Sequence, residues 1–379
     1  MHGAAEIGSI APLNVRVLQV PAAARDHVLD ALQHNPNIEF AETNAVAAAG
    51  ALTNDPYVTN GSEWHLNKIQ APDAWGMTSG DASTIIAICD TGVAPTAGSD
   101  EQAVTGYNVY ANDTDTSDDY GHGTDVAGTA AAQGNNGLGV AGIAWSASIL
   151  PIKISDPTGY ATYSDMAAAL TYAVDHGARV INRSFYGSSS STTLQSAADY
   201  VWSHNGMIFA CAGNTGTSAP QYPAACQNVT AVSATDSYDL VTTFSNYGSN
   251  ISLSAPGSGV WTTNRDGTYS SWSGTSFSSP IAAGAAALIV ARNPQLTNAT
   301  VIDLLKNSDD LGSAGYDIYY GCGRVNPYRA LLAAGAPPPI DTITPVTSIT
   351  VGKHGFGRRI RSSGRDRQRW RHKSGALSG

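Results

Sequence analysis

Three reactive side chains lie beside glycines in separate parts of the sequence. Asp90 is in "ICDTG", His122 is in "DDYGHGTDVAG" and Ser276 is in "SGTSFSSP". A serine hydroxyl is a weak nucleophile at neutral pH, so it needs an adjacent base, and a histidine base needs a third group to fix its tautomer. Glycines allow the close backbone approach that such a site requires. Together the three residues therefore indicate nucleophilic acyl transfer.

Each of these residues also has a purely structural explanation. Asp90 alone can cap a turn, His122 alone can be a loop histidine, and Ser276 alone is most simply a helix N-cap. Asn214, in "FACAGNTG", can be a turn residue, or its amide can join the backbone N–H of Ser276 in an oxyanion hole. The occurrence of all four in glycine-rich strand-to-helix contexts favours the chemical interpretation.

The surrounding pattern predicts elements that can bring these residues together. Short apolar strands alternate with helices, which predicts a parallel sheet covered on both faces, a three-layer αβα sandwich of the α/β class with a mainly parallel twisted sheet. The predicted strands are 84–91, 147–154, 179–185, 207–214 and 228–235, and the predicted helices are 124–133, 163–178, 194–206, 276–292 and 299–307. Sites in such sheets gather at the carboxyl ends of strands, where Asp90, His122 and Ser276 can converge.

The segments "CDTG", "GHGTDVAG", "AGN" and "GTSFSSP", in that order, resemble the motifs of the subtilisin-like serine proteases over roughly residues 54–335. The resemblance implies a secreted serine endopeptidase of broad specificity that acts on proteins and peptides through an acyl-enzyme. It implies that Asp90 orients His122, that His122 is general base and then acid, that Ser276 is the nucleophile, and that Asn214 completes the oxyanion hole.

The resemblance also implies a substrate-binding edge that sandwiches an extended peptide by β-augmentation. Its residues here are Ser184, Phe185, Tyr186, Gly187, Cys211, Ala212 and Gly213. Two positions depart from the family pattern. Tyr186 replaces a glycine, and its ring can narrow the primary pocket. Asp125 replaces the histidine of "HGTHVAG", one helical turn from His122, and we hypothesise that it raises the pKa of His122.

A structural calcium site is a further implication, because "GNNGLGVAG" resembles the family's calcium loop. Calcium prefers oxygen ligands, including backbone carbonyls. The matching residues are Asp55, Asp100, Gly134, Asn136, Leu138 and Val140. The alternative is a Gly/Asn-rich turn. The acidic stretch 112–119 can form a second, weaker site, or a solvated loop.

Residues 15–43 predict a strand, a helix and a strand, and this β-α-β unit resembles the second half of the family's propeptide, an intramolecular chaperone and inhibitor. The predicted domains are a partial propeptide and linker at 1–50, a catalytic domain at 51–335, and a Pro/Thr-rich linker with a disordered basic tail at 336–379. "DTITPVTSIT" resembles the beginning of an accessory β-domain, which the basic tail does not continue.

Composition excludes several function classes. Nine of the 20 Lys and Arg residues lie after Val351, although the whole chain has a net charge of −10, so the body is acidic and does not suit nucleic-acid binding. No stretch of 18 apolar residues is present, which predicts no membrane partner. No export signal is visible after Met1, although the resemblance implies an extracellular monomer.

The cysteines and the triad order exclude two further classes. The four cysteines show no CxxC spacing, so zinc is not expected. Cys89 and Cys211 are predicted to be buried thiols, and a Cys211–Cys226 disulfide remains open. An α/β-hydrolase esterase is excluded, because no GxSxG segment is present and the Asp, His, Ser order differs from that fold. The remaining alternative is a propeptide-inhibited or inactive pseudo-protease that only binds peptides.

Overall fold

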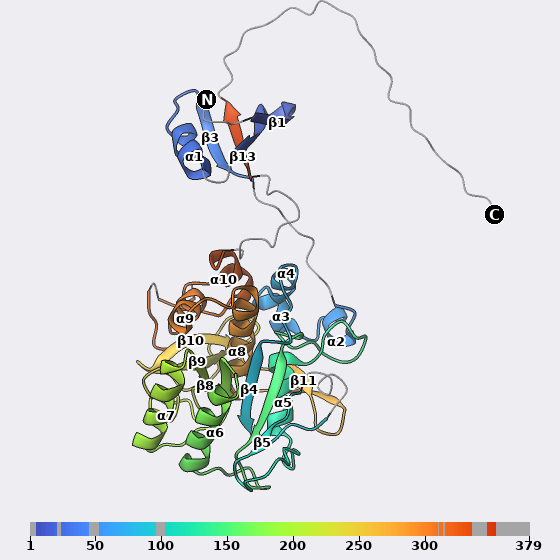
Figure 1. Cartoon of the computed structure of the whole chain (residues 1–379), viewed down its shortest axis with the longest axis vertical. Coiled ribbons are helices and arrows are strands. Elements are labelled where there is room, and N and C mark those ends of the chain that lie inside the picture. Colours follow the sequence, from blue (N-terminus) through green and yellow to red (C-terminus); the bar gives the residue numbers. More distant parts are fainter. Residues whose placement is uncertain are drawn as a thin grey trace, which may run out of the picture. The chain divides into compact units, whose positions relative to one another are not determined.

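The computed structural model describes residues 5–20, 24–44, 53–95, 103–309, 311–313, 315–335 and 347–353. The chain divides into two compact units (Figure 1). The large unit spans Ala48–Pro339, and the small unit combines Met1–Ala47 with Ile340–Gly379.

The large unit is built on a seven-stranded sheet in the order β10-β9-β8-β7-β4-β6-β5, and every strand pair in it is parallel. Its strands are β4 (Ile85–Asp90), β5 (Tyr107–Asn108), β6 (Ser148–Lys153), β7 (Val180–Arg183), β8 (Met207–Cys211), β9 (Val229–Thr235) and β10 (Ile251–Pro256). The strand β4 comes first along the chain but lies in the interior of the sheet, so later strands lie on both sides of it. Its carboxyl end is therefore a topological switch point, where α/β proteins form their sites.

Helices and one hairpin complete the large unit. The hairpin pairs β11 (Val260–Thr263) with β12 (Tyr269–Trp272). The helices are α2 (Pro56–Thr59), α3 (Trp64–Lys68), α4 (Ala71–Trp75), α5 (His122–Ala131), α6 (Tyr163–Asp175), α7 (Thr192–Ser203), α8 (Thr275–Arg292), α9 (Asn298–Lys306) and α10 (Pro327–Ala333).

The core lies on both faces of the sheet. Along β4, Ile86 and Ile88 belong to the apolar cluster that contains α5 and α8, whereas Ala87 and Cys89 belong to the cluster that contains α6 and α7. Alternate residues of a strand point to opposite faces, so helices cover both sides of the sheet. The predicted three-layer α/β architecture with a mainly parallel sheet is confirmed.

The small unit has a four-stranded sheet in the order β1-β2-β13-β3, and its three strand pairs are antiparallel. Its elements are β1 (Ala5–Ile10), a 3-10 turn (Ala11–Leu13), β2 (Val15–Val20), α1 (Arg25–Gln33), β3 (Ile38–Thr43) and β13 (Thr347–Lys353). The β-α-β prediction for 15–43 agrees with β2, α1 and β3. Over Thr347–Lys353, however, the prediction of a linker followed by a disordered tail is wrong, because these residues form the strand between β2 and β3.

No helix among the described residues is both long and apolar enough to span a bilayer.

Candidate active site

Asp90 and His122 are in direct contact at the switch point. Asp90 ends β4 and is completely buried, and the Nδ1 atom of His122 lies 2.7 Å from its Oδ1 atom. The N–H of Thr91 donates to the same oxygen at 2.9 Å. A carboxylate bound to Nδ1 leaves Nε2 of the imidazole as the base, which is the tautomer that proton abstraction requires.

The start of α5 positions His122. Gly121 precedes the helix with a φ of 110°, and a Cβ at Gly123 would lie 2.1 Å from the carbonyl oxygen of Gly92. Only glycine permits that backbone approach between the β4 turn and the helix. The glycines of "GHGT" are therefore explained by the packing that carries His122 to Asp90.

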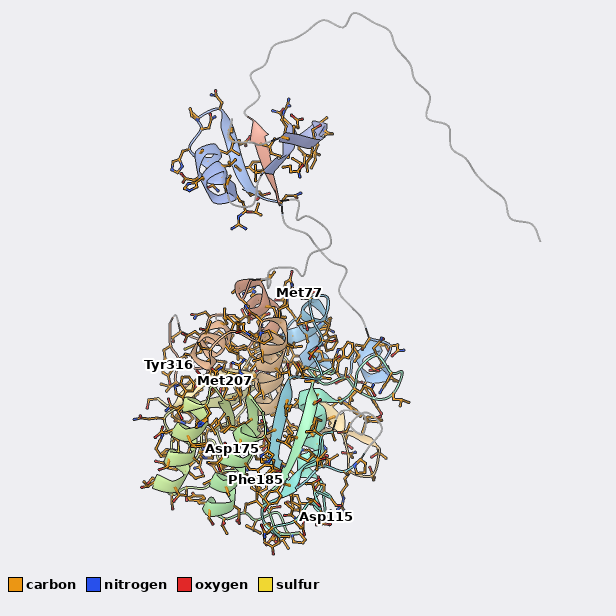
Figure 2. All side chains as sticks on the ribbon, viewed as in Figure 1. Met77, Asp115, Asp175, Phe185, Met207 and Tyr316 are labelled. Carbon is orange, nitrogen blue, oxygen red and sulfur yellow. The ribbon has the colours of Figure 1, made fainter. Side chains whose placement is uncertain are left out.

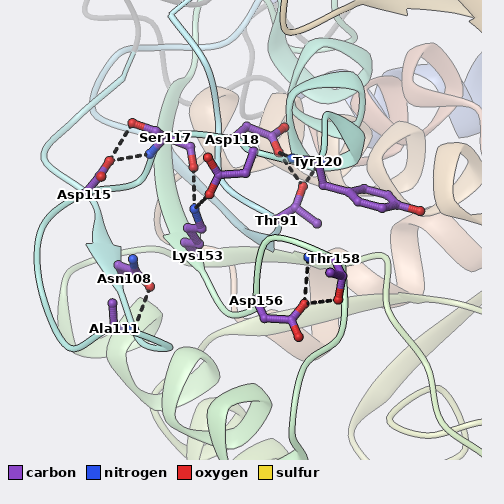
Figure 3. A network of polar contacts seen from close by, with 12 residues as sticks. Thr91, Asn108, Ala111, Asp115, Ser117, Asp118, Tyr120, Lys153, Asp156 and Thr158 are labelled. Carbon is purple, nitrogen blue, oxygen red and sulfur yellow. Dashed lines mark hydrogen bonds and ion pairs between the residues drawn. The ribbon is translucent and has the colours of Figure 1, made fainter.

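Asp118 is a positioning residue that sequence reasoning placed only in an acidic loop. Its carboxylate accepts hydrogen bonds from the Thr91 hydroxyl at 2.8 Å and from the Thr124 N–H and hydroxyl at 2.9 and 2.6 Å. It also accepts from the N–H groups of Tyr120 and Gly121. Figure 3 shows this loop together with Lys153, which donates to the Ser117 carbonyl and to Asp119. One buried carboxylate thus ties the end of β4 to the first turn of α5.

Ser276 is not the N-cap of α8. The cap position is Gly274 and has no side-chain cap bond, while the Ser276 hydroxyl lies 3.4 Å from the Ser184 carbonyl oxygen, a long contact. Ser184 in turn donates from its hydroxyl to the Ser276 carbonyl at 2.8 Å. The hydroxyl of Ser276 is therefore free of a capping role, and the structural alternative for this residue is not supported.

Asn214 lines the same cavity as Ser276. Its Oδ1 atom accepts from both the N–H and the hydroxyl of Thr275, each at 2.8 Å. The hydroxyl of Thr275 accepts from the N–H of Gly213 at 3.1 Å. These donors fix the orientation of the amide, and its Nδ2 atom donates no hydrogen bond to a described residue. Thr275, which sequence reasoning did not single out, thus positions an unused donor.

Two open cavities meet at His122 and Ser276. The first has a volume of about 690 Å³ and is also lined by Asn214 and Asp125. The second has a volume of about 540 Å³ and is lined by a segment predicted to bind substrate, Ser184, Phe185, Tyr186 and Gly187. The other predicted substrate residues, Cys211, Ala212 and Gly213, are buried at the end of β8 and line neither cavity.

Carboxylates surround His122 and affect its titration. Burial by itself lowers the pKa of His122, but the charge of Asp90, the hydrogen bond to it, and the charges of Asp125 and Asp118 together raise that pKa above its ordinary value. Burial also raises the pKa of Asp125, to about 7. The direction agrees with the hypothesis that Asp125 raises the pKa of His122.

The predicted calcium loop folds around Asp55. This carboxylate is completely buried and accepts from the N–H groups of Asn135, Asn136 and Gly137 at 2.7, 3.1 and 3.2 Å. The side-chain oxygen of Asn136 accepts from the Leu138 N–H at 2.8 Å.

The oxygen donors of this loop fit a hard cation. Within the described ranges, the carbonyl oxygens of Gly134, Leu138 and Val140 accept no hydrogen bond from a backbone N–H, and carboxylate, amide and carbonyl oxygens are the ligands that calcium prefers. Asp100 lies outside the described residues. No group of three His, Cys, Asp or Glu side chains with metal-binding geometry occurs in the part of the chain that the structure describes.

The cysteines have no role in a disulfide. All four are free, and Cys89, Cys211 and Cys226 are buried. Burial raises the pKa of the Cys89 and Cys211 thiols to about 12, so both are neutral. The two predictions of buried thiols are confirmed, and the open Cys211–Cys226 pairing is not formed.

Known proteins that resemble this chain agree with the interpretation that the site performs acyl transfer by a serine. The model of the subtilase family, Peptidase_S8, matches residues 81–323. The chain is 40% identical over 282 residues to thermitase of Thermoactinomyces vulgaris, covering 73% of this chain and 98% of that protein. It is 39% identical over 305 residues to a thermophilic serine proteinase of Bacillus sp. (strain AK1), covering 80% and 75%.

A solved structure agrees with the sequence matches. A protease from Pseudoalteromonas arctica PAMC 21717 superposes with a TM-score of 0.70 and 29% identity, over 75% of this chain and all of the other. The chain belongs to the subtilase family. It is a serine endopeptidase, a hydrolase of peptide bonds.

Proposed function

We propose that Ser276, His122 and Asp90 form the catalytic triad of this endopeptidase. Ser276 attacks the scissile carbonyl, while His122 accepts its proton and later delivers that proton to the leaving amine. Asp90 holds the imidazole in the required tautomer and stabilises its protonated form. The observation that carries the proposal is the 2.7 Å contact between Asp90 and His122 at a cavity shared with Ser276.

Asn214 stabilises the oxyanion in this proposal. The tetrahedral intermediate carries a negative oxygen, which hydrogen-bond donors stabilise best when they are already oriented. Nδ2 of Asn214 is such a donor, because Thr275 engages the other end of the amide. The N–H of Ser276, in the first turn of α8, is the second donor, and the helix N-terminus favours negative charge there.

An extended peptide binds along Ser184–Gly187, and broad sequence tolerance follows because β-augmentation recognises the backbone. Tyr186 lines the 540 Å³ cavity where the family has glycine, which narrows the primary pocket. We infer that small or slender side chains are preferred there.

Hydrolysis of a reporter peptide tests the proposal. We expect the wild-type protein to cleave a fluorogenic peptide and Ser276→Ala to lose this activity while it retains the wild-type melting temperature. Ser203→Ala is the matched control, because this exposed hydroxyl at the end of α7 lies outside the site. Equal activity in wild type and Ser276→Ala would rule out Ser276 as nucleophile.

We also propose that residues 1–50 are a partial propeptide, the chain's own partner, and that the secreted, mature enzyme acts as a monomer. The β-α-β unit at 15–43 supports the propeptide assignment. Mass spectrometry of the purified chain tests it, since self-processing predicts a new N-terminus between Ala47 and Asn54. That N-terminus is absent in Ser276→Ala. Its presence in the variant would indicate cleavage by another protease.

Asp55, Asn136 and the carbonyls of Gly134, Leu138 and Val140 hold a structural calcium ion in this proposal, with Asp100 as a further ligand. The ion would neutralise the buried carboxylate and tie the loop to the start of the large unit. Added calcium is then expected to raise the melting temperature of wild type, and Asn136→Ala is expected to reduce that gain. An equal gain in both proteins would contradict this ligand set.

A further inference from the structure

Arg183 is a completely buried arginine that none of the roles above uses. It is the last residue of β7 and heads the set of largest fully buried side chains in the described chain. A buried guanidinium is tolerated when it is hydrogen-bonded and its charge is compensated. The neighbours of Arg183 therefore indicate its role.

The hydrogen bond of Arg183 reaches the strand that carries Asp90. Its Nη1 atom donates to the Cys89 carbonyl at 2.7 Å. The ladder between β4 and β7 ends at the pair Ile88 and Asn182. The pairing of β4 with β7 therefore stops before Cys89. The Arg183 side chain holds the peptide group between Cys89 and Asp90 in its place.

The same guanidinium contacts the substrate-binding segment. It lies 5.2 Å from the centroid of the Phe185 ring, within the range of a cation–π interaction. Phe185 is labelled in Figure 2. Its ring meets the His122 ring edge-on, with centroids 5.9 Å apart and an interplanar angle of 82°. Arg183 thus contacts Phe185, whose ring lies against His122, and the peptide group that precedes Asp90.

Arg183 and Asp90 carry opposite charges that can compensate each other. Neither the Nε and Nη2 atoms of Arg183 nor the Oδ2 atom of Asp90 has a hydrogen-bond partner among described atoms. Burial lowers the pKa of Arg183, while Asp90 and the thiols of Cys89 and Cys211 act in the opposite direction. Because both thiols are neutral, Asp90 is the counter-charge within the described residues.

We propose that Arg183 is a positioning residue that anchors the end of β4 and the ring of Phe185 around His122 and compensates the buried charge of Asp90. The inference rests on the proposed roles of Asp90 and His122. The charged groups that act on His122 are Asp90 on β4, Asp118 before α5 and Asp125 on α5. Arg183 on β7 carries the opposite charge, so we expect its removal to make the surroundings of His122 more negative.

Arg183→Met tests the proposal by a readout that does not depend on hydrolysis. The pKa of His122, measured by NMR of the imidazole, is expected to rise by about one unit, because a nearby positive charge disfavours the imidazolium. Arg183→Lys, which keeps the charge, is expected to recover part of the shift. Arg179→Met is the matched control. Arg179 also donates to backbone carbonyls, but it directly precedes β7, whereas Arg183 ends that strand.

Kinetics supply the second readout. Loosening Asp90 and Phe185 is expected to reduce kcat about tenfold or more in Arg183→Met, with a smaller change in KM. The acid limb of the pH profile moves upward with the His122 pKa. A wild-type pKa and kcat in a folded Arg183→Met would overturn the proposal. If neither the wild-type protein nor any variant hydrolyses peptides, the proposed function is wrong. The change in the His122 pKa measured by NMR still tests the inference about Arg183.

A double variant covers the case in which Arg183→Met does not fold. Neutralising both partners leaves no unpaired buried charge, so Arg183→Met combined with Asp90→Asn is then expected to fold. Failure of the double variant to restore folding would contradict the pairing of Arg183 with Asp90.

Discussion

The two units of this chain bury their elements by different means. The large unit takes every strand of its main sheet from residues 85–256, and α8 is buried from Thr275 to Val290. In the described part of the small unit, the buried members of the apolar cluster are Val20, Val28 and Ala41. The strands β2 and β3 lie on either side of β13 and pair with it, not with each other. A unit with few buried groups depends more strongly on each strand pairing.

A proline in β13 tests that dependence and has the largest expected effect. Val351 is opposite Arg16 of β2 and Ala41 of β3. Val351→Pro removes a backbone donor from a central strand and is expected to destabilise the small unit by about 1–3 kcal/mol. Because its core is small, that loss is expected to abolish hydrogen-exchange protection in β2 and β3, with protection in α8 unchanged.

Ser363→Pro is the control for this experiment, because it introduces the same residue beyond the strand. Unchanged protection of β2 and β3 in Val351→Pro would show that the small unit does not need β13, and would remove the contrast between the units.

The core of the large unit supplies the second comparison. A Cβ at Gly284 of α8 would lie 2.6 Å from Cβ of Ile143 and 3.0 Å from the carbonyl oxygen of Ala130. Gly284→Val is therefore expected to destabilise the large unit by about 1–3 kcal/mol through overpacking. Denaturant unfolding measures this, and the large unit should remain folded in buffer.

Ala299→Val, on an exposed position of α9, is the control for Gly284→Val and should change the free energy of unfolding by less than about 0.5 kcal/mol. A fall in stability at Gly284 no larger than at Ala299 would contradict the tight packing of α8 against Ile143.

The smallest expected effect concerns the two carboxylates beside His122. Asp90 is hydrogen-bonded to the imidazole, whereas Asp125 acts on it through its charge. His122 must be neutral to accept a proton, so activity rises as pH passes its pKa. The pKa of Asp125 is itself about 7, so its carboxylate is only partly ionised where His122 titrates. Asp125→Asn removes this partial charge and is expected to shift the acid limb of kcat/KM downward by about half a pH unit.

Asp303→Asn, an exposed position on α9, is the control and should leave the pH profile unchanged. An acid limb in Asp125→Asn that coincides with that of wild type would show that Asp125 does not tune His122.

The sequence predicted the large unit well because its signals are local. The strand predicted at 84–91 is β4, and the helix predicted at 276–292 is α8, since continuous apolar runs and flanking glycines define both. Asp90 and His122 were predicted for the same reason, because each lies within a short glycine-containing segment.

The features that were missed depend on partners distant in sequence. The strand β13 pairs with residues more than 300 positions away, and its own sequence has only two apolar residues in alternation, Ile349 and Val351, which is too short a pattern to predict a strand. The role of Arg183 was missed because arginine is usually exposed, and only the structure shows that this one is completely buried. Asp118 reads as one of several loop acids, although its carboxylate joins Thr91 to Thr124 in the first turn of α5.

The most direct test of the central claim is covalent labelling of Ser276. A fluorophosphonate reacts with a serine that an adjacent base activates, and the label is located by mass spectrometry of the digested protein. The account predicts one adduct, on the peptide that contains Ser276, with loss of the adduct in Ser276→Ala and strong reduction in His122→Ala. A label on another residue, or equal labelling of Ser276 in His122→Ala, would contradict it.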